Sequence, residues 1–355
     1  MIQKIGHIIR FSYKEFELWR NLTNSRNEAI ALHAQVVKRK KKKFLSRKIL
    51  NQIKSYSLNY FGKSDYWPWL ALYAEVREKF IEGWVPEDYY VYNLLPDLNP
   101  VSISGVSTIK SFDHRLFKGF SVEPLAVINS GVYYNHLQQE IDDAELNKIF
   151  ENYNNEVVIK RDRGPSGGGI TFKHSTKVKK SDFKKGYDYV IQPSVKQHKN
   201  INEVYQKSVN TLRIVTIIDR NQSTKELYTV MRFGMSGARN DNMITGGGFI
   251  LFNEEGRAYP NAYDNLALSL GKKHPDTDYE FKNLWIPSFK EAIDCCKIAH
   301  KLFPYVRLIA WDVYIDESGT PKLIEWNAKK PGMWWWEALV GPLWSKTDLN
   351  FFHST

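Results

Sequence analysis

Two short apolar runs near the end of the chain, joined by a stretch of turn-forming residues, constrain the fold most. The runs are residues 306–315 and 322–327, and the connection 316–321 holds acids, Ser, Gly and Pro. Such a connection between two apolar runs is typical of a turn between paired strands. The pattern therefore predicts a β-hairpin.

Each predicted strand carries side chains with oxygen ligands. Glu325 and Asn327 are two residues apart, so they point to the same face of their strand, and Asp312 on the partner strand can face them. Carboxylate and amide oxygens are hard ligands that suit Mg²⁺ or Mn²⁺. The alternative is three polar residues on the exposed face of a hairpin. Apolar neighbours around both carboxylates favour the metal, because a buried carboxylate needs a partner.

A glycine-rich segment follows a short β-branched run that ends in Lys160. Residues 161–170 hold four glycines within six residues, which lets backbone N–H groups approach a phosphate closely. We expect Lys160 to reach the α- and β-phosphates as a point charge, and the amides of Ser166, Gly167, Gly168 and Gly169 to cover the β- and γ-phosphates. The segment is neither a Walker A loop nor a Rossmann fingerprint. The alternative is a flexible hairpin tip.

A further predicted strand, residues 187–192, runs into a segment suited to adenine. Binding of the base there would need a backbone carbonyl and a backbone N–H. Gln192 ends the strand.

These motifs occur in the order seen in ATP-grasp enzymes. Residues 208–213, 241–242 with 246–248, and 274–277 further resemble the sugar-transfer-associated ATP-grasp branch, and the resemblance covers roughly residues 89–344. It implies an α+β fold in which two subdomains grip ATP. Residues 1–85 lie outside the resemblance, and their helical spacing and charge predict a basic helical N-terminal extension. After this extension (1–85) we expect an N-terminal or linker subdomain (86–155), a lid with the glycine loop and hinge (156–200), and a C-terminal subdomain with the metal site (201–355).

The resemblance also implies residue roles. Lys160 and Arg213 become the catalytic cations, with Arg213 donating to the γ-phosphate and to acyl-phosphate oxygens. The alternative for Arg213 is a salt bridge to a nearby acid. Asn210, Asn242 and His274 become acceptor-site residues, and the alternative for each is a turn or cap.

Two positions depart from the family pattern. The family usually has an Asp-Lys pair where this chain has Asp113-His114-Arg115, so His114 or Arg115 must supply the positive charge at the nucleotide. Pro193 stands where an acid often follows the hinge glutamine, Gln192. The resemblance implies that the hinge uses the carbonyl of this residue, which proline keeps, and the N–H two residues later, at Val195. Glu203 is a candidate for the acid that binds the ribose.

The implied reaction is an ATP- and Mg²⁺- or Mn²⁺-dependent ligation. A carboxylate is activated as an acyl phosphate, and an amine then gives the amide, ADP and phosphate. The resemblance places the substrates in a cell-surface or capsular polysaccharide or in its sugar or amino-acid precursor. The alternatives are a phosphotransferase on the same scaffold and a non-catalytic nucleotide-binding scaffold.

The positive charge of the chain lies at its N-terminal end. The net charge is +11, and residues 1–60 hold 14 Lys or Arg against 3 acids, so residues 61–355 sum to zero. The run 38–43 consists of six basic residues and suits an anionic membrane surface. A solvated helix face is the alternative, and nucleic acid is the least favoured partner.

Apolar residues recur at three- and four-residue intervals in the first part of the chain, which predicts helix there. No apolar run is long enough to span a bilayer, and charges near the N-terminus argue against a secretory signal. The two cysteines, Cys295 and Cys296, are adjacent in a helical pattern and suit a core. We therefore expect a cytoplasmic protein, peripheral at the inner face of the membrane if the basic run binds lipid.

Overall fold

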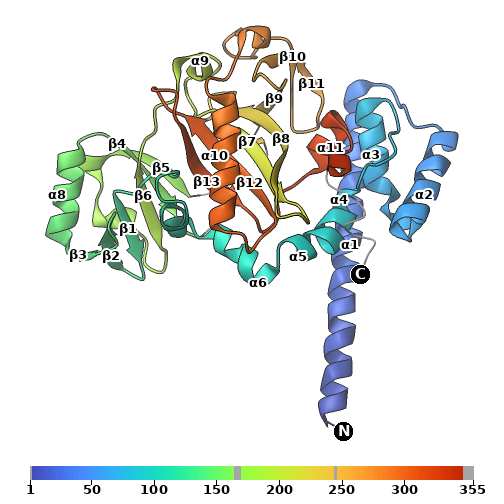
Figure 1. The fold of residues 1–355 in the computed structure, drawn as a ribbon, viewed down its shortest axis with the longest axis horizontal. Coiled ribbons are helices and arrows are strands. Elements are labelled where there is room, and N and C mark those ends of the chain that lie inside the picture. The colour runs from blue at the N-terminus through green and yellow to red at the C-terminus, as the bar shows by residue number, and fades with distance from the viewer. Residues whose placement is uncertain (1, 164–168, 244–245, 347–355) are drawn as a thin grey trace. The chain divides into compact units, whose positions relative to one another are not determined.

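The computed structural model describes residues 2–163, 169–243 and 246–346 (Figure 1). The chain divides into two compact units, which are described separately here. The helical unit comprises Met1–Pro100, Leu266–Leu268 and Gly332–Thr355, and the sheet unit comprises Val101–Asn265 and Ser269–Pro331.

The helical unit is built around a helix that is buried on nearly all sides. Its helices are α1 (Ile2–Lys40), α2 (Arg47–Phe61), α3 (Trp67–Arg77), α4 (Glu87–Tyr89), a π-helical turn (Tyr90–Leu94), α5 (Leu95–Leu98) and α11 (Trp334–Val340). Helix α3 contacts α1, α2 and α11, which is why every residue from Pro68 to Glu75 is buried. Within the described residues, none of the helices is long and apolar enough to cross a membrane.

A buried carboxylate fixes the connection between α1 and α2. Glu75 accepts hydrogen bonds from the backbone N–H groups of Phe44 (2.7 Å) and Leu45 (3.2 Å), and its other partner is the ring of His33 at 3.2 Å. Because a buried carboxylate is costly without such donors, these contacts hold the turn after α1 against α3.

The sheet unit contains two antiparallel sheets. The six-stranded sheet has the order β3-β2-β1-β6-β4-β5. Its strands are β1 (Ala126–Asn129), β2 (Val132–Asn135), β3 (Glu140–Ile141), β4 (Glu156–Arg161), β5 (Ile170–His174) and β6 (Tyr189–Pro193). One face packs on α8 (Asp143–Tyr153), with Val157, Ile159 and Ile191 in the shared core. Alternation along a strand therefore places Val158 and Lys160 on the opposite face.

The seven-stranded sheet has the order β11-β10-β9-β8-β7-β12-β13. Its strands are β7 (Leu212–Ile218), β8 (Thr224–Phe233), β9 (Gly248–Phe252), β10 (Ala258–Tyr263), β11 (Ser269–Gly271), β12 (Leu308–Ile315) and β13 (Pro321–Asn327). The remaining helices of this unit are α6 (Val101–Ser104), α7 (Asp113–Leu116), α9 (Lys199–Asn202) and α10 (Phe289–Leu302).

Helix α10 covers one face of the seven-stranded sheet. Ala292, Cys295, Cys296 and Ala299 of this helix lie in one core with alternate residues of the strands. The strand residues of that core include Leu212, Ile214, Met231, Phe233, Ile309, Trp311, Val313, Leu323 and Trp326. The prediction of an α+β chain with a helical N-terminal segment is confirmed.

Candidate active site

The predicted hairpin is formed by β12 and β13. They pair antiparallel, with Asp312 opposite Glu325 and Ala310 opposite Asn327. Trp311 and Val313 point into the α10 core, so Asp312 points to the other face of the sheet. Directly opposed residues share a face, and Glu325 therefore lies beside Asp312. We call the face of the seven-stranded sheet that carries Asp312 and Glu325 the site face.

A β-bulge in β13 changes the faces to which its residues point. Asp312 pairs with Glu325, whereas the next residue, Val313, pairs with Leu323, so Ile324 is the extra residue. Leu323 and Trp326 are three residues apart, yet both enter the α10 core. In a strand with strict alternation, two residues three apart point to opposite faces. The extra residue Ile324 shifts the alternation by one, so that Leu323 and Trp326 point to the same face.

Two arginines hold the carboxylate of Asp312. Arg213 of β7 makes a bidentate pair, with Nε to Oδ1 at 2.7 Å and Nη2 to Oδ2 at 3.2 Å. Arg232 of β8 lies 3.1 Å from Oδ1. Burial alone would raise the pKa of Asp312, but the two guanidinium charges outweigh it and hold the pKa below its ordinary value. Asp312 is thus ionised, and the salt bridge considered for Arg213 is present.

Arg232 was not singled out from the sequence. It also donates to the hydroxyl of Thr211 from Nε (3.2 Å) and Nη2 (2.8 Å), and it lies 3.6 Å from Asp241. Burial opposes its charge, yet the carboxylates of Asp241, Asp312 and Glu325 outweigh burial and raise its pKa. The available signal was a charged residue that interrupts the apolar second half of β8.

Lys160 reaches this carboxylate group from the six-stranded sheet. Burial lowers the pKa of Lys160, while the charges of Glu325, Asp113 and Asp312 raise it and Lys110 lowers it. Lys110 is itself 3.7 Å from Glu325 Oε1. The charge of Lys160 thus interacts with the carboxylates of the site face.

The three residues of the Asp-His-Arg segment differ in their burial. Asp113 is buried and accepts a hydrogen bond from Trp326 Nε1 at 3.0 Å, and burial together with Glu325 raises its pKa well above the ordinary value. His114 is buried, whereas Arg115 is exposed, with its guanidinium 5.7 Å from the Phe112 ring. The lysine beside Glu325 is Lys110, three residues before Asp113, which the sequence analysis missed.

The proposed acceptor residues are held by backbone groups. Asn210 donates to the carbonyls of Ile201 and Tyr205, both at 3.0 Å. His274 donates from Nε2 to the carbonyl of Gly234 at 2.9 Å. The backbone N–H of Asn242 bonds the side chain of Asn240 at 3.3 Å, and its carbonyl accepts a bond from Gly247 at 3.0 Å. Asn210 and His274 therefore fix the loops that carry them.

Part of the glycine loop lies outside the described residues, namely Ser166, Gly167 and Gly168. Gly169 is described, with a φ of +80°, and a Cβ there would come within 2.9 Å of the Arg161 side chain. Both facts make glycine the residue that this position accepts without strain.

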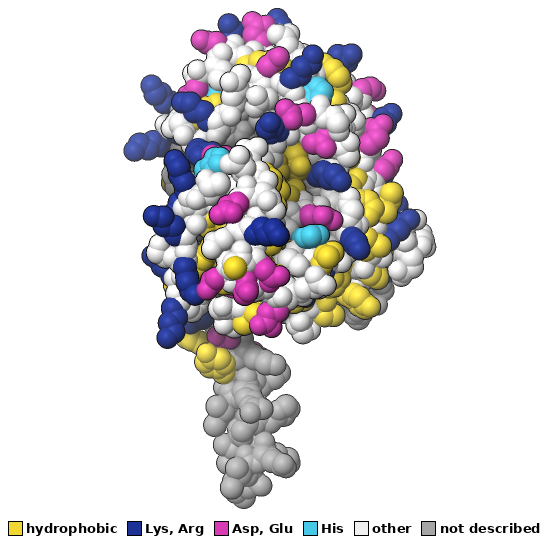
Figure 2. Space-filling view, turned by 90° about the vertical axis from the view of Figure 1, so that its left-hand side faces the viewer, with side chains coloured by type: hydrophobic (Ala, Val, Ile, Leu, Met, Phe, Trp, Pro, Cys, Tyr) yellow, Lys and Arg dark blue, Asp and Glu magenta, His cyan; other side chains and the backbone are white. Residues whose placement is uncertain are grey.

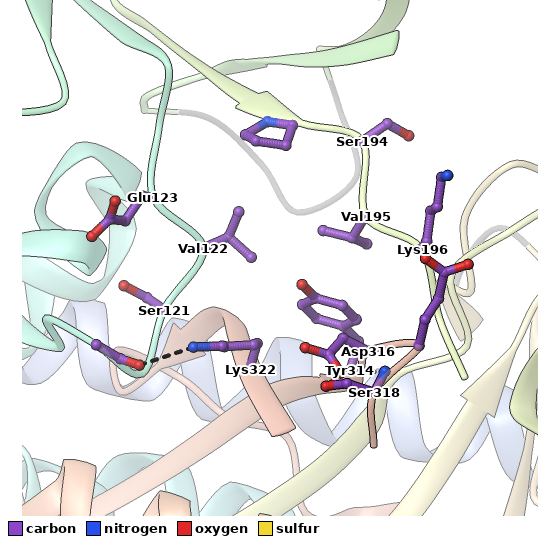
Figure 3. Close-up of a pocket in the computed structure, with 13 residues that line it drawn as sticks. Ser121, Val122, Glu123, Ser194, Val195, Lys196, Tyr314, Asp316, Ser318 and Lys322 are labelled. Atoms are coloured by element: carbon purple, nitrogen blue, oxygen red, sulfur yellow. Dashed lines mark hydrogen bonds between the residues drawn. The ribbon is translucent and has the colours of Figure 1, made fainter. Parts of the chain in front are cut away.

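A pocket of about 570 Å³ opens where the hinge segment meets the hairpin (Figure 3). Its lining residues are Gly119, Ser121, Val122, Glu123, Pro193, Ser194, Val195, Lys196, Tyr314, Asp316, Glu317, Ser318 and Lys322. Tyr314 is two residues from Asp312 and pairs with Lys322, so both lie on the site face. The volume lies in the usual range for a small-molecule site.

Hydrogen bonds tie the pocket walls together. Gln192 donates from Nε2 to the carbonyl of Val122 at 3.0 Å, and Lys322 donates to the carbonyl of Gly119 at 3.1 Å. The backbone of segment 120–122 also bonds Leu323 twice, at 2.9 Å from Leu323 N to Phe120 O and at 3.1 Å from Val122 N to Leu323 O. The acids that line the pocket are Glu123, Asp316 and Glu317, whereas the ribose candidate Glu203 is not among the lining residues.

The fold and this site define an ATP-grasp protein. The chain belongs to the sugar-transfer associated ATP-grasp family, which matches residues 113–341. This match confirms both the resemblance and the predicted fold. No curated protein matches the chain.

Several solved structures are similar at low identity. The ADP complex of purK, an N5-carboxyaminoimidazole ribonucleotide synthetase, has 10% identity and a TM-score of 0.37, covering 74% of this chain and 51% of that chain. The biotin carboxylase domain of 2-oxoglutarate carboxylase from Hydrogenobacter thermophilus, with MgADP, has 12% identity and a TM-score of 0.38, covering 63% and 40%. The ATP-grasp ligase PsnB, with a phosphomimetic variant of its minimal precursor, Mg and ADP, has 12% identity and a TM-score of 0.38, covering 68% and 58%. This chain thus spans between 40% and 58% of their lengths.

Proposed function

We propose that this protein is an ATP-dependent ligase that joins a carboxylate to an amine through an acyl phosphate and releases ADP. The observation that carries the proposal is the site face, where two carboxylates, Asp312 and Glu325, lie together with Arg213 and Arg232, and where Lys160 approaches. Phosphoryl transfer needs positive charges that stabilise the phosphate oxygens and oxygen ligands that hold a divalent cation. The partly buried arginines and lysine would supply the first, and the carboxylates the second.

The residues present fit a hard divalent cation. Among the described residues no group of three or more His, Cys, Asp or Glu side chains could hold a metal ion. The ligand set that we propose is two carboxylates, Asp312 and Glu325, with the amide of Asn327, which pairs with Ala310 on the neighbouring strand. Metal ligands must be deprotonated, and the arginines keep Asp312 so. These three residues would hold Mg²⁺, or Mn²⁺ with the same ligands. When bound, the cation would neutralise charge on the phosphates.

The nucleotide would occupy the pocket beside the hairpin. The carbonyl of Pro193 and the N–H of Val195, both lining residues, would receive the adenine edge, and Gln192 fixes this strand end through Val122. Lys160 would hold the α- and β-phosphates, and the amides from Ser166 to Gly169 would cover the β- and γ-phosphates. We assign to Lys110 the positive charge that the sequence suggested for His114 or Arg115.

The reaction proceeds in two balanced steps. A carboxylate oxygen of the substrate attacks the γ-phosphorus, and the bond to the β–γ bridging oxygen breaks as ADP leaves. The amine nitrogen then attacks the acyl carbon, phosphate leaves with the former carboxylate oxygen, and the nitrogen loses a proton. Arg213 and Arg232 would stabilise the negative charge on the transferring group, because their guanidinium groups are already fixed on the site face.

The substrates we propose are a saccharide, or a sugar or amino-acid precursor of a cell-surface or capsular polysaccharide. The support is the sugar-transfer association of the family. Asn210, Asn242 and His274 remain the proposed acceptor-site residues. Because Asn210 and His274 bond backbone carbonyls, their part would be to hold the loops that shape that site.

A paired screen of carboxylates and amines, with ATP and Mg²⁺, tests the proposal. We expect ADP and phosphate to form only when both substrates are present, and the product mass to equal their sum minus water. A phosphoester of a single acceptor would establish a phosphotransferase instead. Tight ATP binding without turnover on any pair would favour the non-catalytic scaffold.

A further inference from the structure

Helix α1 carries an exposed aromatic stripe. Tyr13, Phe16 and Trp19 are three residues apart, and their exposed fractions are 61%, 55% and 61%. The rings of Phe16 and Trp19 lie 5.9 Å apart. Upstream, the sequence continues the same spacing of apolar residues within 5–9. Large aromatic side chains gathered on one exposed helix face mark a contact surface.

This stripe faces away from the core of the helical unit. Among the residues of α1 whose side chains the structure describes, Ala29 and Val36 are fully buried, and α1 packs on α3. At about 100° per residue, Phe16 lies about 160° round the helix from Val36. Ile30, 47% exposed, continues the stripe toward the C-terminal half of α1.

Basic residues gather where α1 ends. Lys38, Lys41, Lys42 and Lys43 are exposed. Lys40 differs from them, since its ammonium lies 2.7 Å from Glu78 and 2.9 Å from the carbonyl of Glu75. The four exposed lysines offer positive charge to a partner. Lys38 lies only about 40° round the helix from Phe16.

We propose that α1 and the turn after it dock the protein on an anionic lipid bilayer. The aromatic stripe, Tyr13, Phe16 and Trp19, would enter the interfacial region, and the lysine cluster, Lys38, Lys41, Lys42 and Lys43, would contact the headgroups. A helix with aromatic residues on one face and basic residues beside them is suited to lie in a membrane interface. At 1.5 Å per residue, Trp19 and Lys38 are about 28 Å apart, so both engage one surface when the helix lies along it.

The aromatic stripe favours lipid over nucleic acid. Lysines alone would suit either polyanion, but the exposed apolar area of the aromatic stripe gains free energy only where it leaves water. The charge distribution agrees, because the residues after 60 sum to zero, and the face in Figure 2 carries acidic as well as basic side chains. Attraction to lipid is therefore concentrated in the N-terminal segment.

Vesicle flotation tests the proposal on the full chain. We expect binding to vesicles with 30% phosphatidylglycerol at low salt, weak binding to pure phosphatidylcholine, and loss of binding as salt shortens the Debye length to about 3 Å at 1 M. Replacing the four exposed lysines by Gln should weaken partitioning about a hundredfold or more, since each contributes roughly a factor of five near the headgroups.

A matched control removes the same charge elsewhere. Lys184, Lys185, Lys290 and Lys301 are exposed residues of the sheet unit, and their replacement by Gln should leave partitioning unchanged. Circular dichroism of both variants checks that each is folded. Equal losses in the two variants would overturn the proposal, because net charge and not this surface would then be responsible.

The aromatic stripe needs a separate variant. Phe16→Ser with Trp19→Ser should weaken vesicle binding at least about tenfold, because two large apolar side chains no longer leave water. Unchanged binding would overturn the proposed insertion. So would a dimer in light scattering that these two changes dissociate, or RNA binding that competes with vesicles and needs the aromatic residues.

Discussion

At the scale of single residues, the site depends on how buried charges are neutralised. Asp312 sits between Arg213 and Arg232, and Glu325 lies near Lys110 and Lys160. Removing one member of such a group leaves another charge without its partner. Each charged residue here therefore affects both the local structure and the chemistry, and conservative replacements separate the two.

Glu325→Gln is expected to keep the fold and to remove most ATP turnover. The change deletes one ligand charge while preserving shape, and losing such a contact at a transferring phosphoryl group costs about 3 kcal/mol, or a hundredfold or more in rate. Steady-state turnover at saturating Mg²⁺ measures it. Glu291→Gln, an exposed change on α10, is the control. Turnover near that of the parent would refute the ligand assignment.

Lys160 and Arg213 are expected to differ in kinetics. Lys160→Ala should raise the Kd for ATP, because Lys160 would hold phosphates of the bound nucleotide. Arg213→Ala should mainly lower kcat, since its partner is charge that develops during transfer. Arg213→Lys keeps the charge but loses the bidentate geometry, so its kcat should fall between those of the parent and of Arg213→Ala. If Arg213→Ala altered only ATP affinity, its assigned role would be wrong.

Charged residues within apolar segments could be recognised from the sequence. Asp312 and Glu325 stand out because apolar residues flank them. Lys110 and Arg232 share the site through sheet pairing and chain packing over long sequence separations, for example between Lys110 and Glu325. Such contacts have no local pattern, and so sequence reasoning passed over both residues.

At the scale of elements, α10 and β7 meet at a buried histidine. His300 Nδ1 pairs with the hydroxyl of Thr216 at 2.8 Å, and Nε2 donates to the carbonyl of Val306 at 3.0 Å. Burial lowers the pKa of His300 to about 4. The helix is thus joined to the sheet by an uncharged imidazole.

This histidine predicts a pH dependence of stability. An unfolded histidine has a pKa near 6.5, so between pH 6.5 and about 4 the unfolded chain binds a proton that the folded chain does not. The free energy of unfolding is therefore unaffected by protonation of His300 above pH 6.5 and falls by about 3 kcal/mol as the pH drops to 4. Urea unfolding of the parent and of His300→Gln at several pH values measures the difference.

The control for that measurement is His136→Gln, because His136 is exposed. The stability difference between the parent and His136→Gln should not change with pH over the same window. A parent curve that runs parallel to that of His300→Gln would exclude the buried histidine as the cause.

Element boundaries showed where local patterns succeed and fail. The turn chemistry of 316–321 correctly indicated the β12–β13 hairpin. The bulge at Ile324 could not be read from spacing, because Leu323 and Trp326 fit neither a strict strand period nor a helix within so short a run. The pairing with β12 on either side of the bulge is what lets both residues face α10.

At the scale of the whole molecule, nucleotide binding should affect one unit. In hydrogen exchange, MgADP is expected to slow the amides of Val195 and Lys196 and of residues 121–123, which line the pocket. Amides of α2 in the helical unit should exchange as before. The same experiment on Lys160→Ala at equal nucleotide concentration should show little slowing. Protection confined to residues 1–100 would contradict the proposed binding site.

The fold class could be predicted because motifs in fixed order carry it: Lys160 with the glycine segment, the strand that ends at Gln192, and the pair Asp312 and Glu325. The order of strands within the two sheets could not, since it depends on pairings such as β1 with β6, whose residues are about sixty apart in sequence. Nothing local in either strand specifies that neighbour.

The backbone bonds between segment 120–122 and Leu323 have a consequence for solubility. Strand β13 is the last strand of its sheet, and an uncovered edge is a template for another chain. Segment 120–122 covers part of that edge, because it forms hydrogen bonds with both the N–H and the carbonyl of Leu323. Changes that loosen this wall would therefore promote aggregation as well as weaken ligand binding, and a ligand that steadies it would lengthen the shelf life of the protein.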